Sequence, residues 1–378
     1  MFFMTILAVL GPFNPPYPSS QTADQSVRDL APWLRQRLTD IKVVGGNFTL
    51  VRTKGEPTIV HFGIQDSATR KPVSNATIFD WGSITKVFTG MAILQLRAQG
   101  RLNLSDRVAN TVPEVLRLEN VHGNTAAITL KQLMSHTSGL QRGSFPISVS
   151  WAQRWPDWPQ VAATLPWMKV EHQPGSRYAY SNLGVLLLGQ VIEVVTQDGY
   201  ESYMDKNLLR PLGMRSSYFD WTPNYLKPFK SMSYYYDEEG QRQAFPADAN
   251  HGVTTSNGGL KTSIADMITF ARFLLSASPA TTPEILKRPS LEEMLQVQAP
   301  LPEQENQWIC LSFFKRQVNG VDFYSHGGSA NGFLSEMAWA PEHNAVFFIS
   351  INTYARGYGV LRDDLYQRMA RLLAASTD

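Results

Sequence analysis

The sequence predicts an α+β fold in which an antiparallel sheet is flanked by the N- and C-terminal helices and carries an inserted all-helical lobe. Two strand patterns precede residue 65, helix patterns without clear strand alternation fill the middle, and four strand patterns follow residue 307 before a last helix. We therefore divide the chain into a strap at 1–23, a sheet lobe at 24–104 and 258–378, and a helical lobe at 105–257.

The first part of the sheet lobe begins with an amphipathic pattern over residues 24–40, which predicts a helix. Two strand patterns follow, GNFTLVRTKG and EPTIVHFGIQD, joined by a Lys-Gly-Glu-Pro turn. A second helix is predicted from Ser83 to a stop at Gly100. Its apolar residues recur at the three- and four-residue spacing of one buried face: Ile84, Val87, Phe88, Met91 and Leu94.

The middle of the chain contains several predicted helix starts. Thr129 caps LKQLMSH, Ser181 opens the apolar SNLGVLLLGQVIEVVTQ, and GYESYMDKNLLRPLGM also has a helical pattern. The glycine pair Gly258-Gly259 precedes a further helix, SIADMITFARFLLS. This succession of helices predicts the inserted lobe.

The late part of the chain returns to strand patterns. They are WICLSFFKRQV, GVDFYSHGG, FLSEMAWAP and AVFFISIN, and Asn319-Gly320 predicts a tight hairpin turn between the first two. The last helix, RGYGVLRDDLYQRMARLLA, places Leu361, Leu365 and Met369 on one face. That face should pack against the sheet.

Composition bounds the function. The chain has 378 residues, of which 43% are apolar and 17% charged, as in an ordinary globular protein. The net charge of +2 gives no reason to expect a nucleic-acid partner. No apolar run approaches the ~20 residues of a membrane span. The single cysteine, Cys310, excludes internal disulfides and is expected to be buried.

The N-terminus contains a nine-residue apolar run, FFMTILAVL. No basic residue precedes this run and no small-residue cleavage site follows it, although a secretory signal has both. We therefore expect a soluble protein and favour the cytoplasm over secretion. The sequence leaves the oligomeric state open.

Ser83 and Lys86 form an SxxK motif at the predicted helix start. Side chains at i and i+3 share a helix face, so an unprotonated Lys86 could take the proton of a nucleophilic Ser83. The alternative is that Ser83 is only a helix N-cap. A second SxxK, Ser312 to Lys315, falls in a predicted strand, where the two side chains would point to opposite faces.

Two further motifs could complete a catalytic site. Tyr180-Ser181-Asn182 is the only YxN in the chain, although Ser181 could simply be a helix cap beside a packed Tyr180. His326-Gly327-Gly328-Ser329 ends a predicted strand, where glycines allow a substrate to approach the backbone, although His326 could be a turn residue. The seven histidines show no metal-ligand spacing, so we predict neither a metal nor a cofactor.

The three motifs occur in the order of the SxxK, tyrosine and KTG-type motifs of the penicillin-recognising enzymes. With the segments WGSITKVFTG, LMSHTSGL, YAYSNLGVLLLGQVIE, SNGGLKTSIADMITFARFLL and SHGGSANGFLSEMAWAPE, the chain resembles the serine β-lactamase-related family. The likeness is to the class C, D-alanyl-D-alanine carboxypeptidase and esterase side, and it runs from about Gln25 to the last helix. The strap LGPFNPPYP resembles that of fungal members. A β-lactamase/transpeptidase-like fold is implied, with the active site between the lobes.

The resemblance also implies a role for each motif residue. Ser83 would be the acylated nucleophile and Lys86 its general base. Tyr180 would shuttle protons, provided that cations such as Lys86 lower its pKa. Asn182 would hydrogen-bond a substrate carbonyl, and the backbone N–H groups of Ser83 and Ser329 would form the oxyanion hole.

Two other histidines matter to this comparison. His136, in HTSGL, is expected to be structural, in a turn that holds the helical lobe. His326 stands where β-lactamases carry lysine, and a histidine is largely neutral at pH 7. The electrostatic reason for choosing carboxylate substrates is then weakened. We therefore expect ester or amide substrates without an obligatory carboxylate.

The substrate pocket is expected near a tryptophan-rich segment, FPISVSWAQRWPDWPQVAATLPW. Prolines break this segment, which indicates a loop at a cleft rim. Trp151, Trp155 and Trp158 would form that rim, and it would suit a bulky apolar acyl or aryl group.

Three hypotheses follow for the function. The first is a serine hydrolase acting on a small-molecule ester, either as an esterase or as an acyltransferase, because both use the same acyl-enzyme. The second is a D-amino-acid peptidase, an amidase or a weak β-lactamase. The third is a non-catalytic scaffold that has kept the fold.

Overall fold

The computed structural model describes residues 25–121, 124–143, 156–245, 248, 250–276, 285–302 and 304–375. The strap predicted at 1–23, with its apolar run FFMTILAVL, lies outside the described residues. Within them, every helix is too short or too polar to pass through a lipid bilayer.

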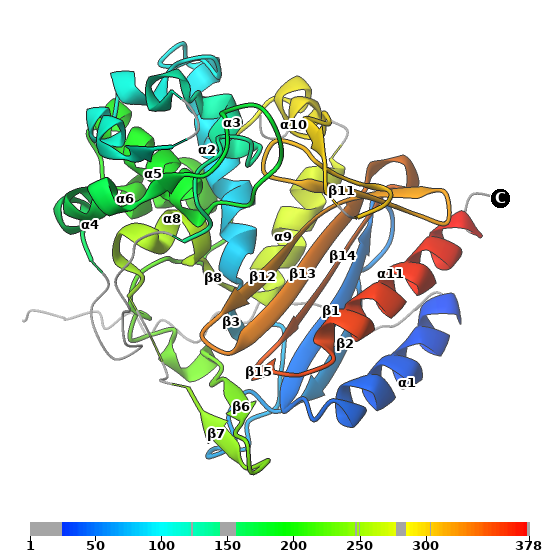
Figure 1. Cartoon of the computed structure of the whole chain (residues 1–378). Coiled ribbons are helices and arrows are strands. Elements are labelled where there is room, and N and C mark those ends of the chain that lie inside the picture. The colour runs from blue at the N-terminus through cyan, green and yellow to red at the C-terminus, as the bar shows by residue number, and fades with distance from the viewer. Residues whose placement is uncertain are drawn as a thin grey trace, which may run out of the picture.

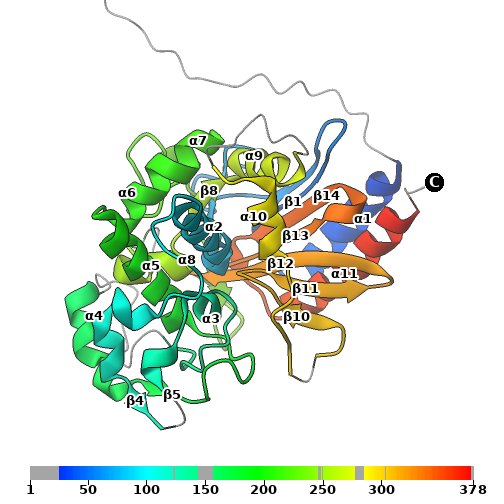
Figure 2. The ribbon, with the colours of Figure 1, turned by 90° about the horizontal axis from the view of Figure 1, so that it is seen from above.

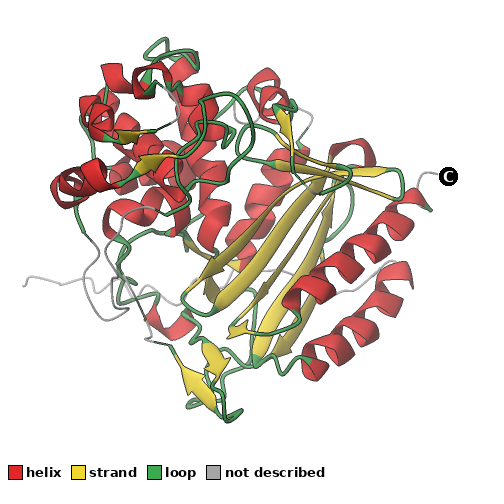
Figure 3. Cartoon of the chain, viewed as in Figure 1, coloured by secondary structure: helices red, strands yellow, loops and turns green. Residues whose placement is uncertain are grey.

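An eight-stranded sheet forms the centre of the molecule (Figures 1 and 3), and every pair of neighbouring strands is antiparallel. Its order is β2 (Thr58–Gly63), β1 (Gly45–Arg52), β14 (Ala345–Ile351), β13 (Phe333–Ala340), β12 (Val321–Ala330), β11 (Phe314–Val318), β10 (Gln307–Ile309) and β9 (Ala299–Pro300). The predicted antiparallel sheet is therefore confirmed, and it joins the first hairpin to the late strands through β1 and β14.

Both faces of this sheet are covered. Helices α1 (Gln25–Asp40) and α11 (Tyr358–Ala374) lie side by side on one face, and α9 (Ile264–Leu275) lies on the other (Figure 1). Neighbouring residues of a strand point to opposite faces, so Phe347 packs in the core beneath α1 and α11 while Phe348 packs in the core on the side of α9. The predicted apolar face of the last helix is buried in the first of these cores.

A helix-rich side lies beyond α9. Helix α2 (Thr85–Ala98) stands between this side and the sheet (Figure 2) and packs against α5 and α8. Other helices are α3 (Leu130–Met134), α4 (Trp158–Thr164), α5 (Asn182–Thr196), α6 (Tyr200–Met204), the π-helix η6 (Asp205–Leu209), α7 (Arg210–Leu212), α8 (Thr255–Gly258) and α10 (Arg288–Met294). Single 3₁₀ turns are η1 (Gly82–Ile84), η2 (Val108–Asn110), η3 (Pro113–Arg117), η4 (Thr125–Ala127), η5 (Leu165–Trp167), η7 (Lys227–Phe229), η8 (Gly252–Thr254) and η9 (Pro341–His343).

Two predicted helix caps are confirmed. Thr129 forms a capping box with Gln132 at the start of α3. The hydroxyl of Ser181 accepts a hydrogen bond from the N–H of Gly184 at the start of α5. Local side-chain chemistry therefore set these boundaries as the sequence indicated.

The region from 105 to 257 is helix-rich but not entirely helical, which refines the predicted lobe. It holds β4 (Glu119–Asn120) paired with β5 (Lys169–Val170), and β6 (Tyr234–Tyr236) paired with β7 (Arg242–Ala244). β6 also pairs with β15 (Thr353–Tyr354) from the C-terminal part, and β3 (Ile78–Asp80) pairs with β8 (Lys261–Ser263). Strands of two or three residues are too short to show alternation in a sequence.

The segment WICLSFFKRQV is a tight hairpin, and the prediction of one continuous strand is wrong. β10 ends at Ile309, β11 begins at Phe314, and Ser312 between them has φ = 62°. The connecting residues are almost fully buried. The apolar run in the sequence therefore reflects burial and not an extended backbone. The predicted hairpin at Asn319-Gly320 is confirmed, with φ values of 48° and 80°.

Candidate active site

Ser83 lies in the 3₁₀ turn η1, two residues before α2 begins at Thr85. The N-cap positions of η1 and α2 are Trp81 and Ile84, and neither makes a side-chain capping bond. The hydroxyl of Ser83 instead accepts a hydrogen bond from Lys86 Nζ at 3.1 Å. The interpretation of Ser83 as a mere N-cap is therefore wrong.

Lys86 lies directly behind Ser83 and is only 1% exposed. Its Nζ donates to Ser83 Oγ at 3.1 Å and to the backbone carbonyl of Asn257 at 2.6 Å. Burial, and then the nearby charge of Arg142, hold the pKa of Lys86 well below its usual range. A lysine amine that loses its proton so readily can act as a base toward the serine.

Tyr180 lies in the loop that precedes α5, and the centroid of its ring lies 5.1 Å from Lys86 Nζ. Burial raises the pKa of Tyr180 to about 12, although the hydrogen bond to Ser83 and the charge of Arg142 act to lower it. The prediction that cations would lower the pKa of this tyrosine is wrong, because burial outweighs them. Tyr180 is therefore a neutral proton donor at physiological pH.

His136 holds the loop that carries Tyr180. Its Nδ1 accepts a hydrogen bond from the N–H of Ser181 at 3.1 Å, and its carbonyl accepts one from Ala179 at 2.7 Å. The imidazole ring lies 4.4 Å from the Tyr180 ring between centroids. Burial, and then the charge of Lys86, hold the pKa of His136 well below 6.5, so the ring is neutral. These contacts support the structural role expected for His136.

The end of β12 approaches the turn that carries Ser83 more closely than side chains would allow. A Cβ on Gly328 would lie 2.0 Å from the carbonyl oxygen of Trp81, and one on Gly82 would lie 2.7 Å from the backbone nitrogen of Ser329. Glycine is therefore required at both positions. This contact brings the backbones of Ser83 and Ser329 together, as an oxyanion hole between their N–H groups would need.

His326 is neutral and points one ring nitrogen at a polar partner. Its Nδ1 lies 2.7 Å from the carbonyl oxygen of Gly327, which assigns the proton to Nδ1. No donor in the described part of the chain reaches the buried Nε2. Burial, and then the charge of Lys86, lower the pKa of His326 to about 3. The expected weakness of cationic attraction at this position therefore holds.

A cleft of about 460 Å³ opens onto these residues. Six predicted site residues line it: Ser83, Tyr180, His326, Gly327, Gly328 and Ser329. Asn182 is not among the lining residues; it is the first residue of α5, half-buried, and its backbone carbonyl accepts a hydrogen bond from Asn257 at 3.4 Å. The prediction that Asn182 contacts a substrate carbonyl therefore has no support in this geometry.

The sequence missed the aromatic wall of the cleft. Tyr178 and Phe314 line it, and the Phe314 ring lies edge-on to His326 at 5.2 Å and to Tyr178 at 6.0 Å. Phe314 is the first residue of β11, and its segment had been interpreted as one long strand. The hairpin at Ser312 brings this ring beside Tyr180 and His326.

Three arginines also line the cleft and were not singled out in the sequence. Arg142 lies over the Tyr180 ring at 4.9 Å, and Arg316 and Arg362 both bond Asp363, at 2.7 and 3.1 Å. They come from a loop, from β11 and from α11, so no local pattern connects them. The cleft therefore contains more positively charged side chains than His326 alone would suggest.

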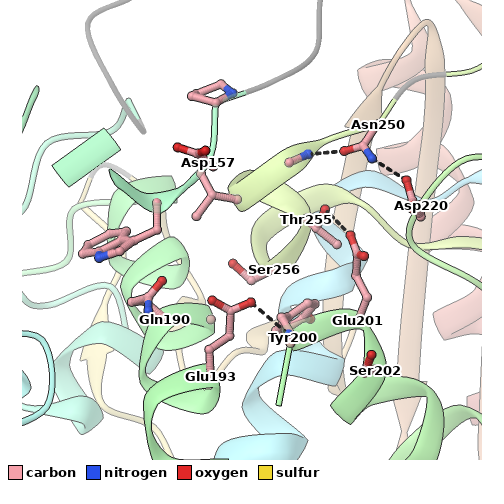
Figure 4. A pocket seen from close by; sticks show the side chains of 16 residues that line it. Asp157, Gln190, Glu193, Tyr200, Glu201, Ser202, Asp220, Asn250, Thr255 and Ser256 are labelled. Atoms are coloured by element: carbon pink, nitrogen blue, oxygen red, sulfur yellow. Dashed lines mark hydrogen bonds between the residues drawn. The ribbon is translucent and has the colours of Figure 1, made fainter. Parts of the chain in front are cut away.

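Trp158 does not line this cleft. It is the first residue of α4 and lines a second pocket, described below, whose walls are drawn in Figure 4. The other two predicted rim residues, Trp151 and Trp155, lie outside the described residues. The prediction placed Trp158 at the wrong pocket because an aromatic-rich loop indicates a position at the surface but not the pocket it lines.

Comparison with known proteins adds a family to this geometry. The family model described as Beta-lactamase matches residues 30–370. The protein named "Protein flp" from Staphylococcus aureus (strain COL) is 35% identical over 175 residues, which are 46% of this chain and 34% of that protein. The chain thus spans about a third of the length of this curated relative.

Solved structures share the fold. The octameric penicillin-binding protein homologue from Pyrococcus abyssi superposes with a TM-score of 0.74 at 23% identity, over 86% of this chain and 73% of that chain. A D-stereospecific amidohydrolase from Streptomyces sp. gives 0.72 at 23% identity, over 88% and 96%. At this identity the likeness concerns the fold alone.

Proposed function

The chain belongs to the Beta-lactamase family, and from that premise we propose that it is a serine hydrolase that forms an acyl-enzyme on Ser83. One observation carries the proposal. A buried lysine amine of lowered pKa lies 3.1 Å from the hydroxyl of Ser83, at the base of an open cleft. A serine with such a partner is an activated nucleophile.

Acylation would proceed through groups that are already in contact. Ser83 Oγ attacks the substrate carbonyl carbon while its proton passes to Lys86 Nζ. The N–H groups of Ser83 and Ser329 hold the tetrahedral oxyanion, for which one donor can be worth a factor of ~100 to 1,000. The bond to the leaving oxygen then breaks, and that oxygen takes the hydroxyl proton of the neutral Tyr180 while the proton held by Lys86 Nζ is returned to Tyr180. This coupled transfer needs no tyrosinate at rest, so the raised pKa of Tyr180 does not prevent it.

Deacylation decides between two activities. Water attacking the acyl-serine gives an esterase, and an alcohol or amine attacking it gives an acyltransferase. Lys86 would serve again as the base for either acceptor. The same residues therefore support both activities, and only the partition of the acyl group between acceptors separates them.

We favour a small-molecule ester with an apolar acyl or aryl group as the substrate. The cleft offers Tyr178 and Phe314, with Leu301 and Leu334, as apolar contact surface. Because His326 is neutral, it does not require the substrate to carry a negative charge near Ser83. An acyl chain lying on the Phe314 ring would bury apolar area from water.

The test is hydrolysis of p-nitrophenyl acetate, butyrate and octanoate by the wild type, Phe314→Ala and Trp167→Ala. Trp167 is 69% exposed and outside the cleft, so it provides the matched aromatic control. We expect kcat/KM to rise with chain length in the wild type and the control, and to lose about tenfold on the octanoate in Phe314→Ala. Equal rates on all three esters in every protein would contradict the proposed substrate class.

A second candidate, a D-amino-acid peptidase or amidase, is favoured by the arginines of the cleft. Arg142, Arg316 and Arg362 could bind a substrate carboxylate, although Asp363 and Glu336, which also lines the cleft, offset part of their charge. The discriminating measurement compares kcat/KM for D-alanyl-D-alanine, D-alanine p-nitroanilide and p-nitrophenyl butyrate. Preference for the dipeptide, lost in Arg362→Gln, would favour this candidate over the esterase.

A further inference from the structure

A second pocket of about 370 Å³ lies between α5, α6 and α8, and it shares no lining residue with the cleft of Ser83 (Figure 4). Gln190 and Glu193 of α5 line one side, and Glu201 of α6 lines the other. Thr255 and Ser256 of α8 lie between them. The pocket is therefore built from regular elements and does not depend on one loop.

The lining of this pocket is acidic. Asp157, Glu193, Glu201 and Asp220 supply four carboxylates, and no lysine or arginine is among the described residues that line it. Burial, and then the negative charge of Asp220, raise the pKa of Glu201 above its usual range. Like charges in a partly buried site repel one another, so a cation entering the pocket would be favoured.

Lys261 is the cation that acts on Glu201, and its ammonium group already has partners of its own. Lys261 is fully buried, its Nζ donates to the backbone carbonyl of Asp220 at 2.7 Å, and it lies 3.6 Å from the carboxylate of Asp248. Its charge lowers the pKa of Glu201 only against the larger raising effects of burial and Asp220. The pocket therefore keeps an excess of negative charge.

Gln190 gives an independent indication of a ligand. It is 9% exposed and lines the pocket, yet no donor in the described part of the chain reaches its side-chain oxygen. A buried acceptor without a partner costs free energy, which a ligand N–H would recover. The side chains of Glu193 and Glu201 already accept from the N–H of Tyr200 and the hydroxyl of Thr255, and each carboxylate retains further acceptor sites.

The geometry points to an organic cation with two ammonium groups, of the alkyl diamine class, as the ligand of this pocket. One ammonium would lie between Gln190 and Glu193, and the other would lie at Glu201 and Asp220 across the pocket. Among the described residues no three His, Cys, Asp or Glu side chains come close enough together to hold a metal ion, so an extended cation suits these carboxylates better. The inference goes beyond the proposed hydrolase and does not depend on it.

The test is isothermal titration calorimetry of the full chain with 1,5-diaminopentane at pH 7.5 and low salt. We compare the wild type with Glu201→Gln, Gln190→Leu and the control Glu239→Gln, which removes one negative charge at an exposed residue outside the pocket. We expect saturable binding to the wild type and the control. Each pocket variant should raise Kd about tenfold, since each loses one charge-assisted or buried hydrogen bond.

Two results would overturn the inference. One is the absence of a saturable binding heat at diamine concentrations up to about 20 mM. A Kd above that concentration would be too weak for a specific site. The other is the same Kd in all four proteins, which would mean binding to surface charge. Thermal unfolding in parallel identifies a variant that has not folded, and the remaining pocket variant then decides.

Discussion

Lys86 is the residue at which burial and chemistry conflict most directly. Lys86 is 1% exposed, and among the described residues its hydrogen-bond partners are one hydroxyl and one carbonyl, with no carboxylate forming an ion pair with it. Holding a positive charge there is unfavourable, so the proposed role of Lys86 as a base would come at the expense of stability. An apolar residue at position 86 should therefore remove the free-energy cost of burying a charge there.

We predict that Lys86→Met lowers kcat/KM on p-nitrophenyl butyrate by about 100- to 10,000-fold, the usual share of a general base. Its free energy of unfolding in urea at pH 7 should equal or exceed that of the wild type, because methionine has a similar length and no charge to bury. Lys131→Met, at an exposed position of α3, is the matched control and should change neither quantity. A Lys86→Met protein with wild-type kcat/KM would refute the role of Lys86.

The pH dependence of acylation follows from the two shifted pKa values. Lys86 must be neutral to act, and its pKa is lowered, so kcat/KM should rise with pH and level off well below 10.5. Tyr180 must stay protonated, and its pKa is about 12, so no descending limb should appear below about pH 11. A pH–rate profile between 5 and 10 checks this prediction, and a bell with a fall near pH 8 or 9 would contradict it.

Local motifs located Ser83, Lys86 and Tyr180, which the structure brings together, because each motif lies in a short stretch of chain. They could not give the sign of the pKa shift at Tyr180, because burial is a property of packing. They also missed Arg142, Phe314 and Arg362, which lie far apart in sequence and meet only in the fold. Residue types and spacing therefore identified which side chains would meet, whereas their burial and their pKa shifts could be seen only in the structure.

At the scale of elements, the contact between β12 and η1 forms the site. Gly328 lies against the carbonyl of Trp81, and the hydroxyl of Ser335 on β13 donates to the same carbonyl at 3.1 Å. Strands β12 and β13 are thus fixed to η1, the turn that carries Ser83. A methyl group at Gly328 would have to separate them.

We predict that Gly328→Ala lowers kcat/KM by about 100-fold or more, because the oxyanion donors would move apart. Gly359→Ala is the control: a Cβ there meets nothing within 4 Å, and Gly359 is the second residue of α11. That variant should keep wild-type activity and gain about 0.5–1 kcal/mol of stability. Wild-type activity in Gly328→Ala would contradict the close-contact account.

Elements with a local determinant were predicted correctly. Thr129 and Ser181 cap their helices, and Asn319-Gly320 turns its hairpin, because side-chain hydrogen bonds and positive φ angles act within a few residues. The hairpin at Ser312 was missed because its turn is buried among apolar residues and carries no turn signature. The short strands β4 to β7 were missed because strands of two or three residues show no alternation in a sequence.

For the whole molecule, three buried neutral histidines couple folding to pH. Burial is the first cause that lowers the pKa of His136, His251 and His326, with His251 at about 4 and His326 at about 3. Each folded pKa lies below the unfolded value of about 6.5. Their contribution to stability is therefore complete above pH 6.5 and is lost as pH falls toward the folded pKa.

His251 allows this linkage to be measured without touching a proposed catalytic residue. Between pH 7.5 and 5.5 the wild type should lose about 1 kcal/mol more free energy of unfolding than His251→Asn, since one pKa unit corresponds to about 1.4 kcal/mol. Urea unfolding of both proteins at the two pH values checks the prediction, and other titrating groups cancel in the comparison. An identical pH dependence in both proteins would contradict it.

The architecture itself was predictable from the order of the patterns along the chain, from the first hairpin through the helices to the late strands. The order of strands across the sheet was not predictable, since β1 pairs with β14 from the far end of the chain. That pairing joins the first hairpin to the late strands, and β12 of the same sheet contacts η1, the turn that carries Ser83. The position of the site at the junction of sheet and helices is thus a property of the whole fold.

The proposed function depends on Ser83 acting as a nucleophile that Lys86 activates. The most direct test is intact-protein mass spectrometry after incubation with a fluorophosphonate and, separately, with p-nitrophenyl butyrate, on the wild type, Ser83→Ala and Lys86→Ala. We predict a single adduct on the wild type, none on Ser83→Ala and a strongly slowed one on Lys86→Ala. A folded wild type that gains no mass with either reagent would contradict the account and favour a non-catalytic scaffold.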